Sequence, residues 1–257
     1  MRFDETSVGI GAGQFRTTCW SAVLLSAQSR APGSTVARDE LCRLYWYPLY
    51  AFVRRRGHSA EDAKDLTQGF FLSLFDRKAL DQVTPIKGKF RSFLLASLKN
   101  YLSVEFYREN TVKRGGNIQF VSLDFESGDE RYSNEPVDAL TPENVFDARW
   151  AMTLLNLAMD QLRAEYDSRG KLATFETLKP FLNFGNSEGL PPYEAVAEKL
   201  HVGTGNVKTL IHRLRKRHGE MLRTEVSRTL TDPEEIDDEI RALCDAVIAA
   251  ERLVDLA

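Results

Sequence analysis

Four histidines and three cysteines are the side chains of this 257-residue chain best suited to metal binding or nucleophilic catalysis. The histidines are His58, His201, His212 and His218. The closest pair, His212 and His218, is six positions apart, whereas four would align two ligands on one helix face. Cys19, Cys42 and Cys244 form no Cys-x-x-Cys pair, which excludes a cysteine-rich zinc site and a disulfide framework. The residues predict no metal centre and a reducing compartment.

Two glycine-containing stretches are candidates for a phosphate-binding loop, and neither has the required context. Gly9, Gly11 and Gly13 follow no predicted strand. Gly88-Lys89 is followed by Phe90 rather than Ser or Thr, and it lacks the earlier glycine of a P-loop. We therefore expect no cofactor and no enzymatic activity.

Residues 193–217 have the layout of a helix-turn-helix. Ala197 is the small residue that lets two helices approach, and Val202 fills the gap after the turn. His201 stands where such motifs usually place Gly in the left-handed conformation, which His tolerates at some cost. The apolar positions of the second helix are Val207, Leu210, Ile211 and Leu214.

The opposite face of this second helix is polar at its start and basic further along. We predict that it binds DNA, because a major groove admits one helix and this pattern suits base edges followed by phosphates. The alternative is a helical hairpin with a solvated basic face. The predicted contact residues are Thr204, Asn206, Lys208, Thr209, His212, Arg213, Lys216 and Arg217.

The stretch 61–74 predicts an amphipathic helix with an acidic outer face. One arc of the helix collects the apolar side chains and Thr67, whose hydroxyl we expect to point towards the core, which argues against a phosphorylation switch there. The opposite arc holds Glu61, Asp62, Asp65, Gln68, Gly69 and Leu72. This arc is either a docking face for a basic partner helix or an ordinary solvated face.

Basic and aromatic residues alternate between positions 87 and 108, a mixture that holds single-stranded nucleic acid through phosphate contacts and base stacking. The candidates are Lys87, Lys89, Arg91, Lys99, Asn100, Tyr107 and Arg108. The competing interpretation is that the rings are core residues, and we expect this of Phe93, Tyr101 and Phe106.

The net charge of −3 hides four charged blocks. Residues 86–116 and 203–223 each carry a net +5, whereas 124–147 and 225–257 each carry −7. Basic patches are the electrostatic footprint of phosphate binding. The acidic N-terminus resembles no signal peptide, and no apolar stretch approaches the ~20 residues of a membrane span. We expect a cytoplasmic protein.

Helical periodicity dominates, so we predict an all-α fold of two small helical domains joined by an acidic linker, with a C-terminal amphipathic helix. Expected helices cover 15–29, 36–56, 59–75, 90–107, a stretch from about 145, 172–184, 193–200, 204–223 and 232–256. The predicted boundaries are an N-terminal extension (1–35), a first domain (36–116), the linker (117–148), a second domain (149–225) and an acidic tail (226–257).

Three motifs in this order resemble those of the extracytoplasmic-function (ECF) family of RNA polymerase sigma factors. They are Asp-Ala-Lys-Asp-Leu-Thr-Gln-Gly-Phe-Phe at 62–71, Phe-Arg-Ser-Phe-Leu and Leu-Lys-Asn-Tyr-Leu within 90–102, and His-Arg-Leu-Arg-Lys-Arg at 212–217. The resemblance spans about 36–116 and 149–223.

The resemblance implies a transcription initiation factor. Asp62, Asp65 and Gln68 would bind the β′ clamp helices of core RNA polymerase. The segment 87–107, with Asn100 at the family's matching position, would open and read the minus-ten element, and the helix-turn-helix would read the minus-thirty-five element. The implied partners are core polymerase, including its β flap, and promoter DNA; an anti-sigma factor or other regulator stays open as a further partner, and no membrane is implied.

The chain departs from the family pattern in three ways. Gly69 replaces the acid that usually follows Gln68, the linker is long, and the helix 232–256 lies beyond the two-domain pattern. This tail either masks the basic recognition helix or packs on the second domain. The rival to a sigma factor is a helix-turn-helix regulator that binds duplex DNA without polymerase.

Overall fold

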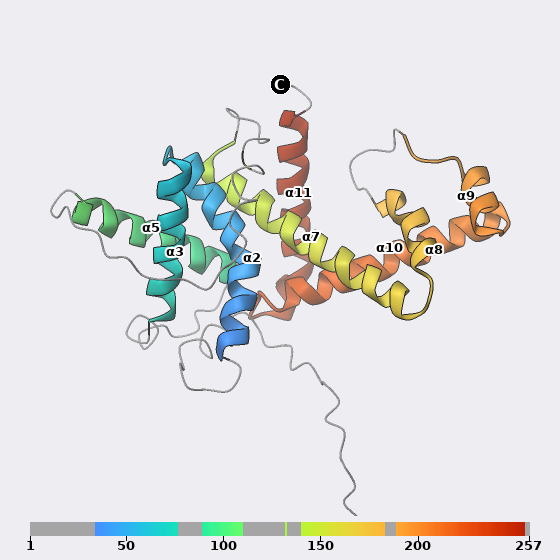
Figure 1. The fold of residues 1–257 in the computed structure, drawn as a ribbon, viewed down its shortest axis with the longest axis horizontal. Coiled ribbons are helices and arrows are strands. Elements are labelled where there is room, and N and C mark those ends of the chain that lie inside the picture. The colour runs from blue at the N-terminus through green and yellow to red at the C-terminus, as the bar shows by residue number, and fades with distance from the viewer. Residues whose placement is uncertain (1–33, 77–88, 110–131, 133–139, 183–188, 255–257) are drawn as a thin grey trace, which may run out of the picture.

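A computed structural model of the chain describes residues 34–76, 89–109, 132, 140–182 and 189–254. Every regular element in these ranges is helical, which confirms the all-α prediction (Figure 1). The helix expected over 15–29, Lys87 and most of the acidic linker lie outside the described residues.

Three helices form the first part of the fold: α2 (Ser34–Arg55), α3 (Ala60–Phe75) and α5 (Phe90–Glu109). Each buries one stripe of side chains at helical spacing, as the sequence pattern predicted. In α5 the buried stripe consists of Phe90, Leu94, Leu98 and Leu102. The side chains on the three facing stripes pack into one hydrophobic cluster.

Ser59 caps the start of α3. The Ser59 hydroxyl oxygen accepts a hydrogen bond from the backbone N–H of Asp62 at 3.1 Å, and the same hydroxyl donates to the Asp62 carboxylate at 2.7 Å. Thr67 is completely buried and donates its hydroxyl to the carbonyl of Ala63 at 2.7 Å, which confirms its inward orientation.

The second part begins with α7 (Pro142–Ser168), a long helix capped by the side chain of Thr141. The segment 142–148, which the sequence interpretation assigned to the linker, therefore forms the first two turns of a helix. Thr141 accepts a hydrogen bond from Asn144 N–H at 3.2 Å, and Pro142 occupies the first turn, where its missing N–H is not needed. The expected start at about 145 was three residues late.

The remaining elements are α8 (Leu172–Leu178), the 3₁₀ turn η1 (Lys179–Leu182), α9 (Tyr193–Leu200), α10 (Thr204–Ser227), the 3₁₀ turn η2 (Pro233–Glu235) and α11 (Ile236–Val254). The predicted helix 172–184 is α-helical only to Leu178 and continues as the turn η1, in which Pro180 has no backbone N–H to donate to the α-helical ladder. Helix α10 runs four residues beyond the predicted end at Arg223, since its apolar stripe continues through Val226.

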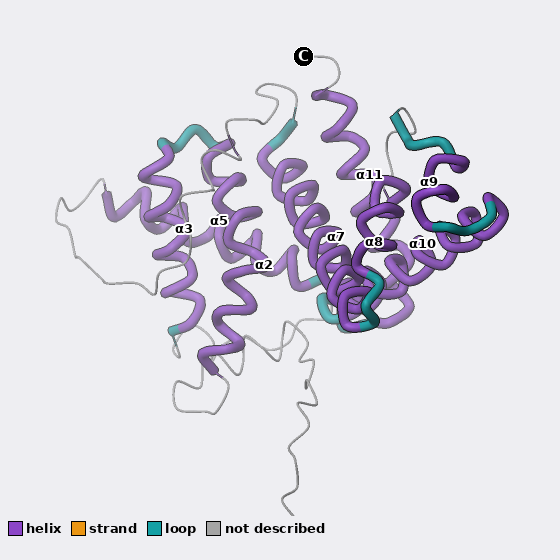
Figure 2. Tube along the Cα trace, turned by 45° about the vertical axis from the view of Figure 1, so that its right-hand side comes forward, coloured by secondary structure: helices purple, strands orange, loops and turns teal. Residues whose placement is uncertain are grey.

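Helices α7 and α10 lie against each other and connect the two ends of the molecule (Figures 1 and 2). Each of them contributes to two hydrophobic clusters. The first cluster takes α7 as far as Ala158 and the end of α10 from Leu222, together with α2, α3, α5 and α11. The second takes α7 from Leu162 and the start of α10, together with α8, η1 and α9.

The clusters therefore do not divide at the predicted boundaries after 148 and 225, and the domain division itself stays a prediction.

Residue Trp150 shows why the two parts meet. It is completely buried, its ring stacks with that of Tyr45 on α2 at a centroid distance of 6.2 Å, and the guanidinium of Arg91 on α5 lies 5.5 Å from its centroid.

Replacing Trp150 by Ala should lower the free energy of unfolding by about 3–5 kcal/mol, because it leaves a cavity where three helices meet. Urea denaturation followed by circular dichroism measures the loss. A loss below about 1 kcal/mol would show that α7 does not depend on this contact.

Candidate nucleic-acid interface

The pair α9–α10 forms the first candidate interface. A three-residue turn joins the two helices, and Val202 N–H donates to the carbonyl of Ala197 at 3.0 Å. His201 ends α9 with φ 52° and ψ 45°, and it is the one non-glycine residue with positive φ in the described part of the chain. The predicted left-handed conformation at this position is thus confirmed.

Helix α10 has the predicted two faces. Val207, Ile211 and Leu214 are buried in the second hydrophobic cluster, and the half-buried Leu210 packs against it. All eight predicted contact residues are exposed: Thr204, Asn206, Lys208, Thr209, His212, Arg213, Lys216 and Arg217. Their role in binding DNA stays a prediction, but the surface that this role requires is present.

Some residues of this face have contacts within the chain. The Lys208 ammonium lies 5.7 Å from the ring centroid of Tyr193, at the start of α9. Arg217 donates to Glu165 on α7 at 2.7 Å and to Glu220 at 3.0 Å, and these hydrogen bonds raise its pKa. Arg217 is therefore held in place by α7, although both it and Lys216 beside it are exposed.

An open cavity of about 680 Å³ lies next to this face. Arg213 and Arg217 line it from α10, and Arg169 and Lys171 line it from the turn between α7 and α8. Sequence reasoning missed the latter two, because no local pattern relates a turn after α7 to the face of α10. They extend the basic surface beyond the recognition helix.

His218, one of the histidines considered as a metal ligand in the sequence, is a core residue. It is completely buried between α10 and α7, where its Nε2 lies 3.5 Å from the Leu155 carbonyl oxygen. Burial lowers the pKa of its ring. Among the described residues, no three His, Cys, Asp or Glu side chains are grouped so that they could hold a metal ion.

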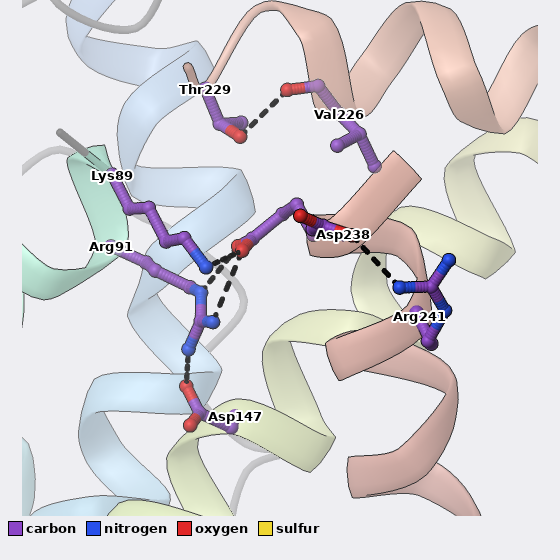
Figure 3. Close-up of polar contacts among 8 residues, drawn as sticks. Lys89, Arg91, Asp147, Val226, Thr229, Asp238 and Arg241 are labelled. Atoms are coloured by element: carbon purple, nitrogen blue, oxygen red, sulfur yellow. Dashed lines mark hydrogen bonds and ion pairs between the residues drawn. The ribbon is translucent and has the colours of Figure 1, made fainter. Parts of the chain in front are cut away.

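The start of α5 forms the second candidate interface, and its cations are paired. Arg91 is 12% exposed, and its guanidinium contacts Asp147 of α7 and Glu239 of α11 (Figure 3). Lys89 places its Nζ 2.6 Å from the same Glu239 carboxylate. The structure therefore brings two of the predicted minus-ten residues together, on carboxylates from distant parts of the chain.

The pKa values in this cluster follow from burial and pairing. Burial alone would lower the pKa of Arg91 and raise that of Glu239. The hydrogen bonds and charges between Arg91, Lys89, Asp147 and Glu239 outweigh burial, so the pKa of Arg91 is raised and that of Glu239 is lowered. Arg91 and Glu239 are therefore both charged at neutral pH.

The rest of the predicted minus-ten surface is divided. Lys99 is half-buried, and its Nζ lies 2.7 Å from Glu143 of α7, whose pKa this hydrogen bond lowers. Asn100 is exposed. The side chains of Tyr107 and Arg108, like Lys87, lie outside the described residues.

The prediction that the Phe106 ring belongs to the core is wrong. Phe93 and Tyr101 pack against the first hydrophobic cluster as expected, but Phe106 is 65% exposed. The buried stripe of α5 ends at Leu102, beyond which Val104 is 55% exposed as well. The helix therefore extends past the part of the core that could cover Phe106.

The outer face of α3 is acidic, as predicted. Glu61, Asp62 and Asp65 are exposed, and Gln68 is half-buried. Gly69 is a correction: it faces the Tyr101 hydroxyl of α5, so a side chain there would collide with the ring unless Tyr101 moved.

No helix in the described ranges is both long and apolar enough to cross a membrane.

Comparisons with known proteins give one distant similarity. No protein family model matches the chain, and no solved structure matches it. Among curated proteins, the chain is similar to the ECF RNA polymerase sigma factor SigE of Mycolicibacterium smegmatis, with 26% identity over 191 residues. The match covers 74% of this chain and 63% of the relative, so the chain spans less than two thirds of the relative's length.

His201 offers a test of the turn between α9 and α10. Replacing it by Gly should raise the free energy of unfolding by about 1 kcal/mol, because a left-handed residue with a Cβ is strained there. Urea denaturation measures the gain. His201→Ala is the matched control and should bring no gain; equal stabilisation by Ala would assign the effect to loss of the imidazole instead.

Proposed function

We propose that the protein is a sigma factor of the ECF type, which binds core RNA polymerase and directs it to specific promoters. The observation that carries the proposal is the extent of the match to a sigma factor. A stretch of 191 residues in a chain of 257 includes residues 67–191 wherever it starts. The similarity therefore cannot come from the pair α9–α10 alone, which begins at Tyr193.

The geometry supports separate roles for three surfaces. The acidic outer face of α3 has the charge to dock on the β′ clamp helices through Asp62, Asp65 and Gln68. The pair α9–α10 acts as a helix-turn-helix on the minus-thirty-five element, and the start of α5 acts on the minus-ten element as it opens. The β flap is the further polymerase contact in this proposal, the site of action is the cytoplasm, and the chain performs no chemistry of its own.

One observation favours the rival function, a regulator that binds duplex DNA without polymerase. The described cations of the minus-ten surface, Lys89, Arg91 and Lys99, are all paired with carboxylates of the same chain. A regulator would need only the exposed face of α10 and would keep these pairs permanently.

Run-off transcription separates the two functions. Purified core polymerase is incubated with and without the full chain on the DNA upstream of its own gene. A sigma factor yields a discrete transcript that depends on the added chain. A chain that binds this DNA in a mobility-shift assay but yields no such transcript is the regulator instead.

Charge reversal on α3 tests the docking face. Asp62→Lys with Asp65→Lys should abolish co-purification with core polymerase, because ion pairs desolvated at an interface are worth about 2–5 kcal/mol when one partner is lost. Helical content should not change, since both carboxylates are exposed in the free chain. Reversal of the exposed Asp160 and Asp167 on α7 makes the same change in charge and should leave co-purification intact. Normal co-purification of the first variant would exclude this face.

The recognition helix is tested by separating base contacts from phosphate contacts. Lys208→Ala or Arg213→Ala should cost about 1–3 kcal/mol and relax preference at one or two positions of the upstream element, as measured by selection from a promoter library. Lys216→Ala should weaken binding to every sequence alike and reduce the salt slope by about 0.9.

Lys216 is the better phosphate probe, because replacing Arg217 would also break its bonds to Glu165 and Glu220. Leu214→Ala should unfold the motif rather than change its sequence preference, since Leu214 is completely buried. If the library selects the same sequences with Lys208→Ala and Arg213→Ala as with the wild type, α10 is not the reader.

A further inference from the structure

Helix α11 does not cover the face that its acidic charge suggested. The exposed arc of α10 between Thr204 and Arg217 stays open, and the contact between these helices lies further along, where Arg223 pairs with Asp237. Helix α11 packs mainly on α7 and directs one carboxylate, that of Glu239, to the start of α5. Of the two alternatives for the tail, masking of the basic face of α10 is therefore wrong, and packing of α11 on α7 agrees with the other.

We infer that α11 is a built-in competitor of promoter DNA: its Glu239 occupies the cations at the start of α5, and it must leave before Lys89 and Arg91 can bind DNA phosphates. The inference rests on the proposed function for its consequence, which is that the free chain is closed at the minus-ten surface and open at the minus-thirty-five surface.

The contact geometry gives both cations carboxylate partners within the chain. The Glu239 oxygens lie 2.6 Å from Nε of Arg91, 3.3 Å from its Nη2, and 2.6 Å from Nζ of Lys89. The remaining Nη1 of Arg91 contacts Asp147 (Figure 3). The guanidinium carbon also lies 5.5 Å from the centroid of the Trp150 ring. Each of the three guanidinium nitrogens thus contacts a carboxylate, and a phosphate at Arg91 would compete with Glu239 and Asp147 for its N–H donors.

Glu239 differs from the other acids of α11. Its side chain is completely buried, whereas Asp237, Asp238 and Asp245 are exposed. A buried carboxylate is stable only with its partners in place, so docking of α11 depends on Lys89 and Arg91 as much as on the apolar residues Ile236 and Leu243. The same two cations therefore serve either α11 or a nucleic acid.

A backbone contact couples this exchange to α10. The N–H of Phe90, between the two cations, donates to the Thr229 carbonyl at 3.0 Å. Thr229 lies in the connection from α10 to α11, where its hydroxyl also donates to the carbonyl of Val226 at 2.7 Å. The connection from α10 to α11 is thus anchored on the start of α5.

The test compares Glu239→Gln with Asp238→Asn in the full chain. Both remove one negative charge from α11, but Asp238 is exposed and pairs with Arg241, three residues further along the same helix. The probe is a short fluorescein-labelled single-stranded DNA of mixed sequence, with binding followed by anisotropy over a range of salt concentrations.

We expect Glu239→Gln to bind the probe about three- to tenfold more tightly than the wild type. Two newly available cations should also steepen the logarithmic salt dependence by about 1.4, at roughly 0.7 per phosphate contact on a single strand. Asp238→Asn should leave the slope unchanged. A folded Glu239→Gln chain with wild-type affinity and slope, or an equal gain with Asp238→Asn, overturns the inference.

The wild-type chain provides a second test that does not depend on the variant folding. Hydrogen exchange of the α11 amides should become faster when the single-stranded probe is saturating, because the probe displaces the helix. Unchanged exchange in α11 at saturation overturns the inference.

Failure of the inference and failure of the proposed function give different results. If the wild-type chain supports run-off transcription and Glu239→Gln brings no gain in probe affinity, the protein is a sigma factor in which α11 does not compete with DNA. If core polymerase does not bind the chain, but Glu239→Gln still binds the probe more tightly and with a steeper salt dependence, then α11 competes with nucleic acid in a protein that is not a sigma factor.

Discussion

Arg91 is the point at which three helices of the first cluster are tied together. Its guanidinium lies over the ring of Trp150 on α7 and contacts carboxylates from α7 and from α11. A guanidinium that is 12% exposed cannot give up its charge, so its burial requires opposite charges within hydrogen-bonding distance. The positions of α7 and α11 against α5 follow from this requirement as well as from apolar packing.

The two longest helices distribute this constraint over the molecule. With 27 and 24 residues, α7 and α10 are about 40 and 36 Å long at 1.5 Å per residue. Neither can be covered by one small cluster, so each passes through both. One ion pair and one hydrogen bond then fix their register: Glu165 of α7 pairs with Arg217 of α10, and Gln161 of α7 donates to the buried Glu225 of α10 at 2.8 Å. Through its contacts with α7, the exposed face of α10 is therefore linked to the start of α5.

Local features were predictable from the sequence because their causes lie within one or two helical turns. The cap at Ser59, the inward Thr67 and the left-handed His201 each depend on neighbours in the chain. The exposed arc of α10 follows from periodicity alone, which also gives the acidic face of α3. Residues that the family resemblance marked as contacts stay predictions, although the exposure of most of them agrees with such a role.

Other features were out of reach because their causes lie far along the chain. Arg91 meets Asp147 and Glu239 across 56 and 148 positions, and no local pattern pairs them. Phe106 has the spacing of a core residue, but nothing in the described chain covers the end of α5 enough to bury it. Gly69 looked like a missing acid on an outer face, whereas its neighbour is Tyr101 of another helix.

Charge in the sequence and charge on the surface are therefore different quantities in this chain. The two basic blocks have equal net charge, yet the block on α10 stays largely exposed while the described cations of the block on α5 are neutralised by acids from α7 and α11. Acids gathered in sequence do not all act alike either, because Glu239 is buried where Asp238 beside it is solvated. A surface whose cations already hold carboxylates binds a polyanion only by exchange, so its affinity is set by the difference between two sets of similar ion pairs. On the exposed face of α10, Arg217 has such partners in Glu165 and Glu220, but no buried carboxylate like Glu239 is described there. Under the proposed function, DNA therefore reaches this surface with less exchange of ion pairs than the start of α5.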